Sequence, residues 1–292
     1  MSSVAEAFDI FRSRLELSTT EREDAIRRHK EVRSVVNAAF DVERDFLTGS
    51  YGRHTKTKPL KDIDIFFVLG AKEAARRNAA PSAMIDAFET CLVSAFGRDS
   101  VERGRRCVTV EFDKKNPSEE GRVLSIDAVP AFGVSDRYEI PDDILGSWIK
   151  SNPETHASEA TAKNKECDGS WIPLVKMLKR WNRSAENPVK PSFLIEVMAQ
   201  KLVVAPFTDY PTEVRSFFAN AREAIFKEWP DPAGLGPPAS DQMTSVRIAA
   251  AVESFRSAEL QAMRAMQLER NGKTGEALSI WRAIMGKYFP TS

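Results

Sequence analysis

The residues of this sequence best suited to chemistry are three aspartates at apolar stretches. Asp62 and Asp64 open the segment DIDIFFVL, and Asp127 is the only acid in RVLSIDAVPAF, residues 122–132. Residues two apart in a strand share one face, with backbones about 6–7 Å apart. Carboxylate oxygens are preferred ligands of Mg²⁺, and two such ions about 3.5–4 Å apart assist phosphoryl transfer. The sequence therefore predicts a two-metal site formed by Asp62, Asp64 and Asp127.

A Gly-Ser turn lies thirteen residues before the first of these acids, at Gly49 and Ser50. Glycine lets the backbone approach a phosphate closely, and the N–H groups with the serine hydroxyl can bind its oxygens. Each part is weak alone, because an isolated Asp-x-Asp most often starts a strand and pairs with a lysine such as Lys61. The combination of the turn, the paired acids and a third acid about sixty residues later favours a phosphate site.

The elements that must position these residues follow from apolar periodicity. Helical spacing predicts two N-terminal helices, the second opened by a capping box at Thr20 and Glu23 and ending at Phe40. Alternation predicts strands near 46–47, 63–69, 107–112 and 122–129, with a hairpin connection at 114–121. Further helices are expected near 84–96, 144–150, 171–183, 191–204, 211–228, 241–268 and 274–288, with a linker at 231–240. The predicted fold class is α+β: a small mixed sheet with flanking helices, then an all-helical lobe.

Composition narrows the class of protein. The 292 residues carry a formal net charge of +0 and are 42% hydrophobic, which suits a globular chain with a sizeable core. A protein that grips long nucleic acid usually has a basic excess, so strong nucleic-acid binding is not expected. Three scattered cysteines and the lack of a long apolar run predict a cytoplasmic protein without a membrane anchor.

A family resemblance rests on these motifs. LTGSYGRHTKTKPLKDIDIFFVL, residues 47–69, resembles the nucleotidyltransferase signature of the polymerase-beta-like superfamily. Within it, the chain is most similar to the CD-NTases, the cyclic GMP–AMP synthase/DncV-like enzymes of bacterial antiphage (CBASS) systems. Further segments that resemble this family in order are YEIPD at 138–142, Trp148, SNPETH at 151–156, LVKMLKRWN at 174–182, KPSFLIEVMA at 190–199 and GKYFP at 286–290.

The resemblance implies a polymerase-beta-like catalytic lobe at 1–160 and a helical, oligoadenylate-synthase-like lobe at 161–292. It implies Mg²⁺ (two ions, with Mn²⁺ as the alternative) at the three aspartates, and a role for Asp127 in deprotonating the acceptor hydroxyl. From the residues alone, the basic face containing Lys179 is more often solvated and Phe193 more often core. The nucleotide-binding residues that the resemblance implies are Gly49, Ser50, Lys179 and Ser192 for phosphates and Phe193 for stacking on a base.

The expected activity is synthesis of a cyclic di- or trinucleotide second messenger from nucleoside triphosphates, with ATP first and GTP or pyrimidine nucleotides as alternatives. The resemblance also implies a separate effector protein that reads the product, and a regulatory protein is an additional candidate partner. The alternatives are another nucleotidyltransferase (linear oligoadenylate, RNA-tailing or small-molecule acceptor), a noncatalytic nucleotide sensor, and an antitoxin partner in a toxin pair. Antitoxin partners of that kind are typically much shorter chains.

Overall fold

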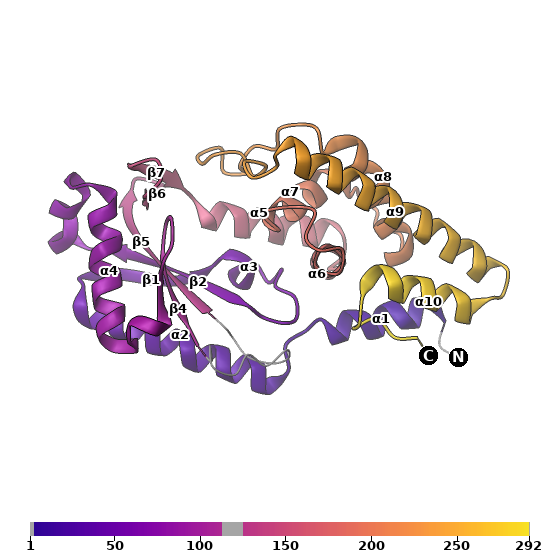
Figure 1. Cartoon of the computed structure of the whole chain (residues 1–292), viewed down its shortest axis with the longest axis horizontal. Helices are drawn as coiled ribbons and strands as arrows, with labels where there is room; N and C mark the ends of the chain where they lie inside the picture. The colour runs from indigo at the N-terminus through magenta and orange to yellow at the C-terminus, as the bar shows by residue number, and fades with distance from the viewer. Residues whose placement is uncertain (1–2, 113–124, 292) are drawn as a thin grey trace. The chain divides into compact units, whose positions relative to one another are not determined.

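The computed structural model describes residues 3–112 and 125–291, and these fall into two compact units (Figure 1). A sheet-containing unit comprises residues 17–157 with 233–236, and a helical unit comprises the residues before 17, 158–232 and those from 237 on. The predicted hairpin connection at 114–121 and the first residues of the predicted strand at 122–129 lie outside the described residues.

The described part of the first unit contains a mixed sheet. Its strand order is β1-β2-β5-β4-β3, and β5 also pairs with β6, which pairs with β7. β2 and β5 run parallel, while the other pairs are antiparallel. The strands are β1 (Val42–Thr48), β2 (Asp62–Leu69), β3 (Val101–Arg103), β4 (Val108–Glu111), β5 (Ser125–Val134), β6 (Arg137–Asp142) and β7 (Ser147–Ser151).

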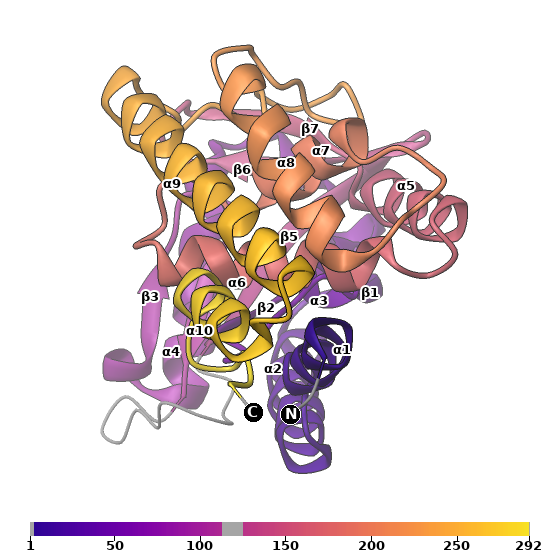
Figure 2. The same cartoon turned by 90° about the vertical axis from the view of Figure 1, so that its right-hand side faces the viewer.

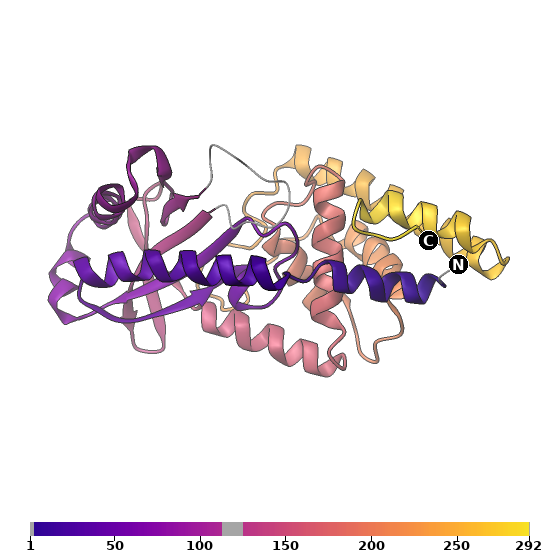
Figure 3. The same ribbon diagram turned by 90° about the horizontal axis from the view of Figure 1, so that it is seen from below.

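Helices cover one face of this sheet. Ile63, Ile65 and Phe67 alternate along β2 and are buried in one apolar cluster with side chains of α2 (Thr19–Ala39) and α4 (Pro81–Phe96). Figure 3 shows α2 lying against this sheet along its whole length. Phe66 and Val68 point to the opposite face and belong to a separate small cluster. The remaining short elements of this unit are α3 (Gly49–Gly52), η1 (Ala71–Asn78) and η2 (Arg98–Ser100).

The helical unit encloses the largest of the three apolar clusters among the described residues. In Figure 2, α9 lies beside α8 and beside α10, and it contacts both of them. Phe8 of α1 contacts Trp281 of α10 and Phe289, with ring centroids 4.9 and 5.0 Å away. The helices are α1 (Val4–Arg14), α5 (Pro153–Glu166, which crosses the division between the units), α6 (Trp171–Ser184), α7 (Phe193–Leu202), α8 (Tyr210–Ala224), α9 (Ser245–Arg270) and α10 (Thr274–Met285).

Helix α1 belongs to the helical unit, whereas the expected division at residue 160 groups it with the catalytic lobe. The physical reason is its apolar face. Phe8 and Phe11 are fully buried, and both lie in the same cluster as Trp171 and Trp281. The segment that begins the chain is therefore held by residues near its end.

Two local predictions are wrong. The helix predicted near 144–150 is a turn followed by β7, in which Ile149 pairs with Ile140 of β6. Its short apolar run fits a strand as well as a helix, and the neighbouring strand decides between them. The capping box of α2 is formed by Ser18 and Glu21 rather than by Thr20 and Glu23, so the helix begins at Thr19. The predicted α+β fold class is confirmed.

Candidate active site

The three predicted aspartates lie on the face of the sheet opposite α2 and α4. Asp64 of β2 stands directly beside Asp127 of β5 in the parallel register, and Asp62 stands beside Ser125. Ile63, the residue between the two β2 acids, is buried with the helices on the other face. The alternation of the strand therefore places both acids of Asp62-x-Asp64 with Asp127, as their spacing predicted.

Two neighbours fix the inner carboxylates. The Thr109 hydroxyl of β4 donates a 2.7 Å hydrogen bond to Oδ1 of Asp127, its register partner across the sheet. Gly49 lies against Asp64 on the other side, and a Cβ atom added to Gly49 would overlap the Asp64 carboxylate. Asp64 and Asp127 are half-buried and Asp62 is exposed, so the cluster opens outward at Asp62.

The turn that follows β1 is closed by backbone hydrogen bonds. The carbonyl oxygen of Ser50 accepts bonds of 3.0 Å from the N–H groups of both Thr55 and Lys56. Gly49 has φ +58°, a left-handed conformation that favours glycine. The predicted phosphate turn therefore lies beside the predicted metal-binding carboxylates within one unit.

The electrostatics of this cluster favour a bound cation. Burial, followed by the charges of Asp127 and Asp62, raises the pKa of Asp64 to about 7, against an opposing effect of Arg53. Burial and Asp62 raise the pKa of Asp127 to about 6, while the hydrogen bond from Thr109 lowers it. Like charges held this close disfavour joint ionisation unless a positive charge lies among them. The ligand atoms that the aspartates offer are carboxylate oxygens, which suit a hard divalent cation such as Mg²⁺.

The aspartates do not form a complete cage in the structure. Within residues 3–112 and 125–291, no group of three or more His, Cys, Asp or Glu side chains is arranged to hold a metal ion. The adjacent pair is Asp64 with Asp127, and Asp62 is the outer third carboxylate. This arrangement fits Mg²⁺, which binds through one or two carboxylates and takes its other ligands from water and substrate phosphates.

A pH dependence of stability follows from these pKa values. Because the pKa of Asp64 is higher in the folded than in the unfolded chain, folding favours its protonated form, and ionisation destabilises the fold as pH rises. Without divalent cations, the free energy of unfolding should fall by about 2 kcal/mol between pH 5 and pH 7 from this group. Thermal melts of wild type and Asp64→Asn in EDTA measure it.

The matching measurement adds Mg²⁺. The cation should raise the melting temperature more at pH 7.5 than at pH 5, because it competes with protons for the same carboxylates. Asp64→Asn should lose most of both effects. A wild-type melting temperature that rises in parallel with that of Asp64→Asn across this pH range would contradict the assignment.

The three predicted nucleotide contacts of the second lobe lie on α6 and α7 of the helical unit. Lys179 is 4% exposed and forms a 2.5 Å ion pair with Glu196 of α7. Ser192 is the exposed N-cap residue of α7, and Phe193 is half-buried against the apolar cluster of this unit. These residues are near one another in sequence and fold, and their contact with nucleotide stays a prediction.

The basic face predicted on α6 is not solvated at its centre. Lys176 is as buried as Lys179 and pairs with Glu16, which follows α1. Each lysine is held by a carboxylate from another segment, which the sequence of α6 alone could not reveal. Arg53 and Thr109 are further residues of the aspartate cluster that the sequence reasoning missed. Arg53 could have been found as the basic residue directly after the turn GSYG. Thr109 could have been found as a polar position in the alternating strand VTVE.

Comparisons with known proteins identify the family. Residues 1–164, more than half of the chain, match the family described as the Second Messenger Oligonucleotide or Dinucleotide Synthetase domain (SMODS). The chain belongs to this family. The resemblance to the CD-NTases of antiphage systems is thereby confirmed, and with it the enzyme class of nucleotidyltransferase.

Similar proteins and solved structures are consistent with this family assignment. A cyclic AMP-AMP-AMP synthase of Acinetobacter sp. (strain ATCC 27244 / 9458) is 28% identical over 306 residues, covering 96% of this chain and 83% of that protein. The solved structure of Escherichia coli MS115-1 CdnC with ATP has a TM-score of 0.73 at 19% identity and covers 98% of both chains. The Bradyrhizobium diazoefficiens CD-NTase CdnG in complex with GTP has a TM-score of 0.72 at 13% identity, covering 96% of this SMODS chain and 97% of that one.

Proposed function

We propose that this SMODS enzyme joins nucleoside triphosphates into a cyclic oligonucleotide, with ATP as substrate and a cyclic trinucleotide as product. The observation that carries the proposal is the adjacency of Asp64 and Asp127 beside Gly49. Two relatives named cyclic AMP-AMP-AMP synthases support the choice of base and ring size. A CdnC structure that shares the fold was solved with ATP, which also supports ATP as the substrate.

The first chemical task is to activate a ribose hydroxyl. Asp127 is proposed to accept its proton, because the family resemblance implies that this carboxylate lies nearest the acceptor hydroxyl. Thr109 holds one oxygen of that carboxylate, so the other remains for the acceptor. The hydroxyl oxygen then forms a bond to the α-phosphorus of a triphosphate, and the bond between that phosphorus and the β-phosphate oxygen breaks to release pyrophosphate.

The second task is to offset the charge of the triphosphate. Divalent cations at Asp62, Asp64 and Asp127 would neutralise phosphate charge and make the hydroxyl more acidic when bound. The Gly49–Ser50 turn would orient the phosphates through its backbone N–H groups and hydroxyl. Lys179 and Ser192 would reach the triphosphate and Phe193 would stack on a base, as the family resemblance implies.

The proposed setting is cytoplasmic antiphage signalling, with the product read by a separate effector protein. A regulatory protein is also proposed, since a solved complex of E. coli MS115-1 CdnC with HORMA-deltaN matches this fold at a TM-score of 0.72. None of the helices in the described residues is long and apolar enough to cross a membrane.

The test is mass spectrometry of the products formed from each of the four ribonucleoside triphosphates with Mg²⁺, before and after phosphatase treatment. A phosphatase-resistant cyclic trimer from ATP alone is expected, and EDTA should abolish it. A product that is linear and phosphatase-sensitive would replace the proposal with linear oligonucleotide synthesis. Turnover only with added RNA or a small-molecule acceptor would indicate another nucleotidyltransferase, and binding by calorimetry without turnover would indicate a sensor.

A further inference from the structure

The outer face of α9 carries exposed apolar side chains that the nucleotidyltransferase reaction does not use. Val246, Leu260 and Met263 are 77%, 55% and 49% exposed. The opposite side of the same helix packs into the helical unit, where Phe255 and several alanines are fully or almost fully buried. One helix therefore has a core face and a second, solvent-facing apolar surface.

The exposed residues follow a regular spacing. We define the outer stripe as six exposed residues of α9, each separated from the next by three or four positions in strict alternation. This is the 3.5-residue repeat by which one helix pairs with another. The residues of the outer stripe are Val246, Ala249, Glu253, Arg256, Leu260 and Met263.

We propose that the outer stripe pairs with the outer stripe of a second copy of this chain in antiparallel orientation. Reversing the stripe converts its spacing of three, four, three, four, three into the same series, so the two copies remain in register along its whole length. A two-fold axis then passes beside Ser254 and generates each contact twice, as an isologous interface requires. The pairs are Val246 with Met263, Ala249 with Leu260, and Glu253 with Arg256 of the second copy.

Charge complementarity selects this orientation. In the antiparallel register, each Glu253 faces an Arg256 of the second copy at the centre, and apolar residues face apolar residues on both sides. A parallel pairing in register would place Glu253 against Glu253 and Arg256 against Arg256, which is repulsive. Within one chain Arg256 and Glu253 form an ion pair of 3.6 Å, and their side chains are 60% and 71% exposed, so the pairs across the interface would add to this exposed pair or replace it.

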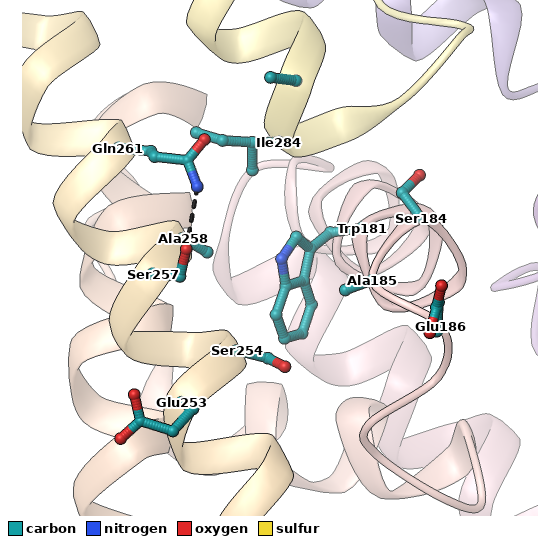
Figure 4. Close-up of a pocket in the computed structure, with 11 residues that line it drawn as sticks. Trp181, Ser184, Ala185, Glu186, Glu253, Ser254, Ser257, Ala258, Gln261 and Ile284 are labelled. Carbon is teal, nitrogen blue, oxygen red and sulfur yellow. Dashed lines mark hydrogen bonds between the residues drawn. The ribbon is translucent and has the colours of Figure 1, made fainter.

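The surface of α9 next to the outer stripe faces other helices of the same unit. A groove of about 450 Å³ lies where α9 meets α6 and α10, with Trp181 and Ile284 in its lining (Figure 4). There the Gln261 amide donates a 3.0 Å hydrogen bond to the Ser257 hydroxyl, so these two polar side chains are partnered within the helix. Glu253 of the outer stripe also lines this groove, so the outer stripe borders the groove along one edge.

The size of the stripe determines the strength of the dimer. From Val246 to Met263 the helix is about 27 Å long and about 10 Å wide, so roughly 300 Å² per copy would be covered. A standard stable interface covers about 800 Å² per partner. We therefore expect a weak, reversible dimer rather than a permanent one.

The test is sedimentation of the full chain between about 1 and 300 μM, using a charge swap. Arg256→Glu leaves only glutamates at the centre and Glu253→Arg leaves only arginines, so each variant alone should show at least tenfold weaker dimerisation. An equal mixture of the two variants should regain the wild-type affinity, because each unlike pair is then restored. Arg270→Glu is the matched control, since Arg270 lies on the same helix beyond the overlapping residues and its variant should dimerise like wild type.

Circular dichroism of each variant checks that α9 remains folded. A wild-type chain that is monomeric at 300 μM would overturn the proposal. So would dimers whose affinity is unchanged by both single charge reversals, because such dimers would use another surface. A mixture of the two variants that stays monomeric while both are folded would exclude the antiparallel register, and a separate protein captured on an outer stripe that does not self-associate would also count against it.

Discussion

Asp64→Asn is expected to reduce pyrophosphate release by at least about 10³-fold. The substitution removes the carboxylate that lies beside Asp127 and against Gly49, and an amide has neither the charge nor the oxygen pair that a divalent cation requires. The double variant Asp62→Asn/Asp64→Asn should abolish turnover. Continuous pyrophosphate assays with ATP and Mg²⁺ at fixed pH measure the effect.

The stability of the same variant separates chemistry from folding. Because Asp64 is repelled by two other acids and is partly desolvated, its neutral replacement should leave the melting temperature in EDTA equal or higher at pH 7.5. Asp136→Asn, at an 85% exposed side chain in the turn before β6, is the matched control and should retain full activity. An active Asp64→Asn enzyme would remove the basis of the proposed reaction, and an unfolded one would show that Asp64 is structural.

Gly49→Ala is expected to lower kcat/KM for ATP by about 10²-fold. Its added Cβ would overlap the Asp64 carboxylate, and the turn already holds a left-handed backbone. Either Asp64 or the phosphate turn must therefore move, and both belong to the proposed site. Steady-state pyrophosphate release over a range of ATP and Mg²⁺ concentrations measures the loss.

Gly146→Ala provides the control for backbone strain. Gly146 has φ +62°, close to the +58° of Gly49, but an added Cβ there has no atom within 4 Å. Each alanine should therefore cost about 1–2 kcal/mol of stability through its backbone, while only Gly49→Ala should impair turnover. Equal activity of the two variants would show that close contact with Asp64 is not required.

The sequence was most informative where chemistry and strand pattern coincide. Asp62, Asp64 and Asp127 stand out because each is an acid at an apolar strand, and alternation alone places the first two on one face. The side-by-side placement of Asp64 and Asp127 depends on the parallel register of β2 and β5, which pairs segments about sixty residues apart. No local pattern specifies such a register, and Asp127 was predicted to join the pair because it is the only acid in an otherwise apolar strand.

Long-range packing explains what the sequence did not reveal. Lys179 is readily interpreted as part of a solvated basic face, but Glu196 from α7 pairs with it in the interior. The strand at 147–151 has too few residues to distinguish itself from a helical turn until β6 pairs with it. Each error arises at a residue whose partner lies in another element, beyond the reach of periodicity.

The anchoring of α1 has a consequence for synthesis on the ribosome. Its aromatic face is translated long before the rings that cover it, Trp281 and Phe289, which follow nearly every other described element. At bacterial elongation rates of about 5–20 residues per second, that delay lasts on the order of tens of seconds. During this interval Phe8 and Phe11 lack these ring partners, so the core of the helical unit is completed only after Phe289 has been translated.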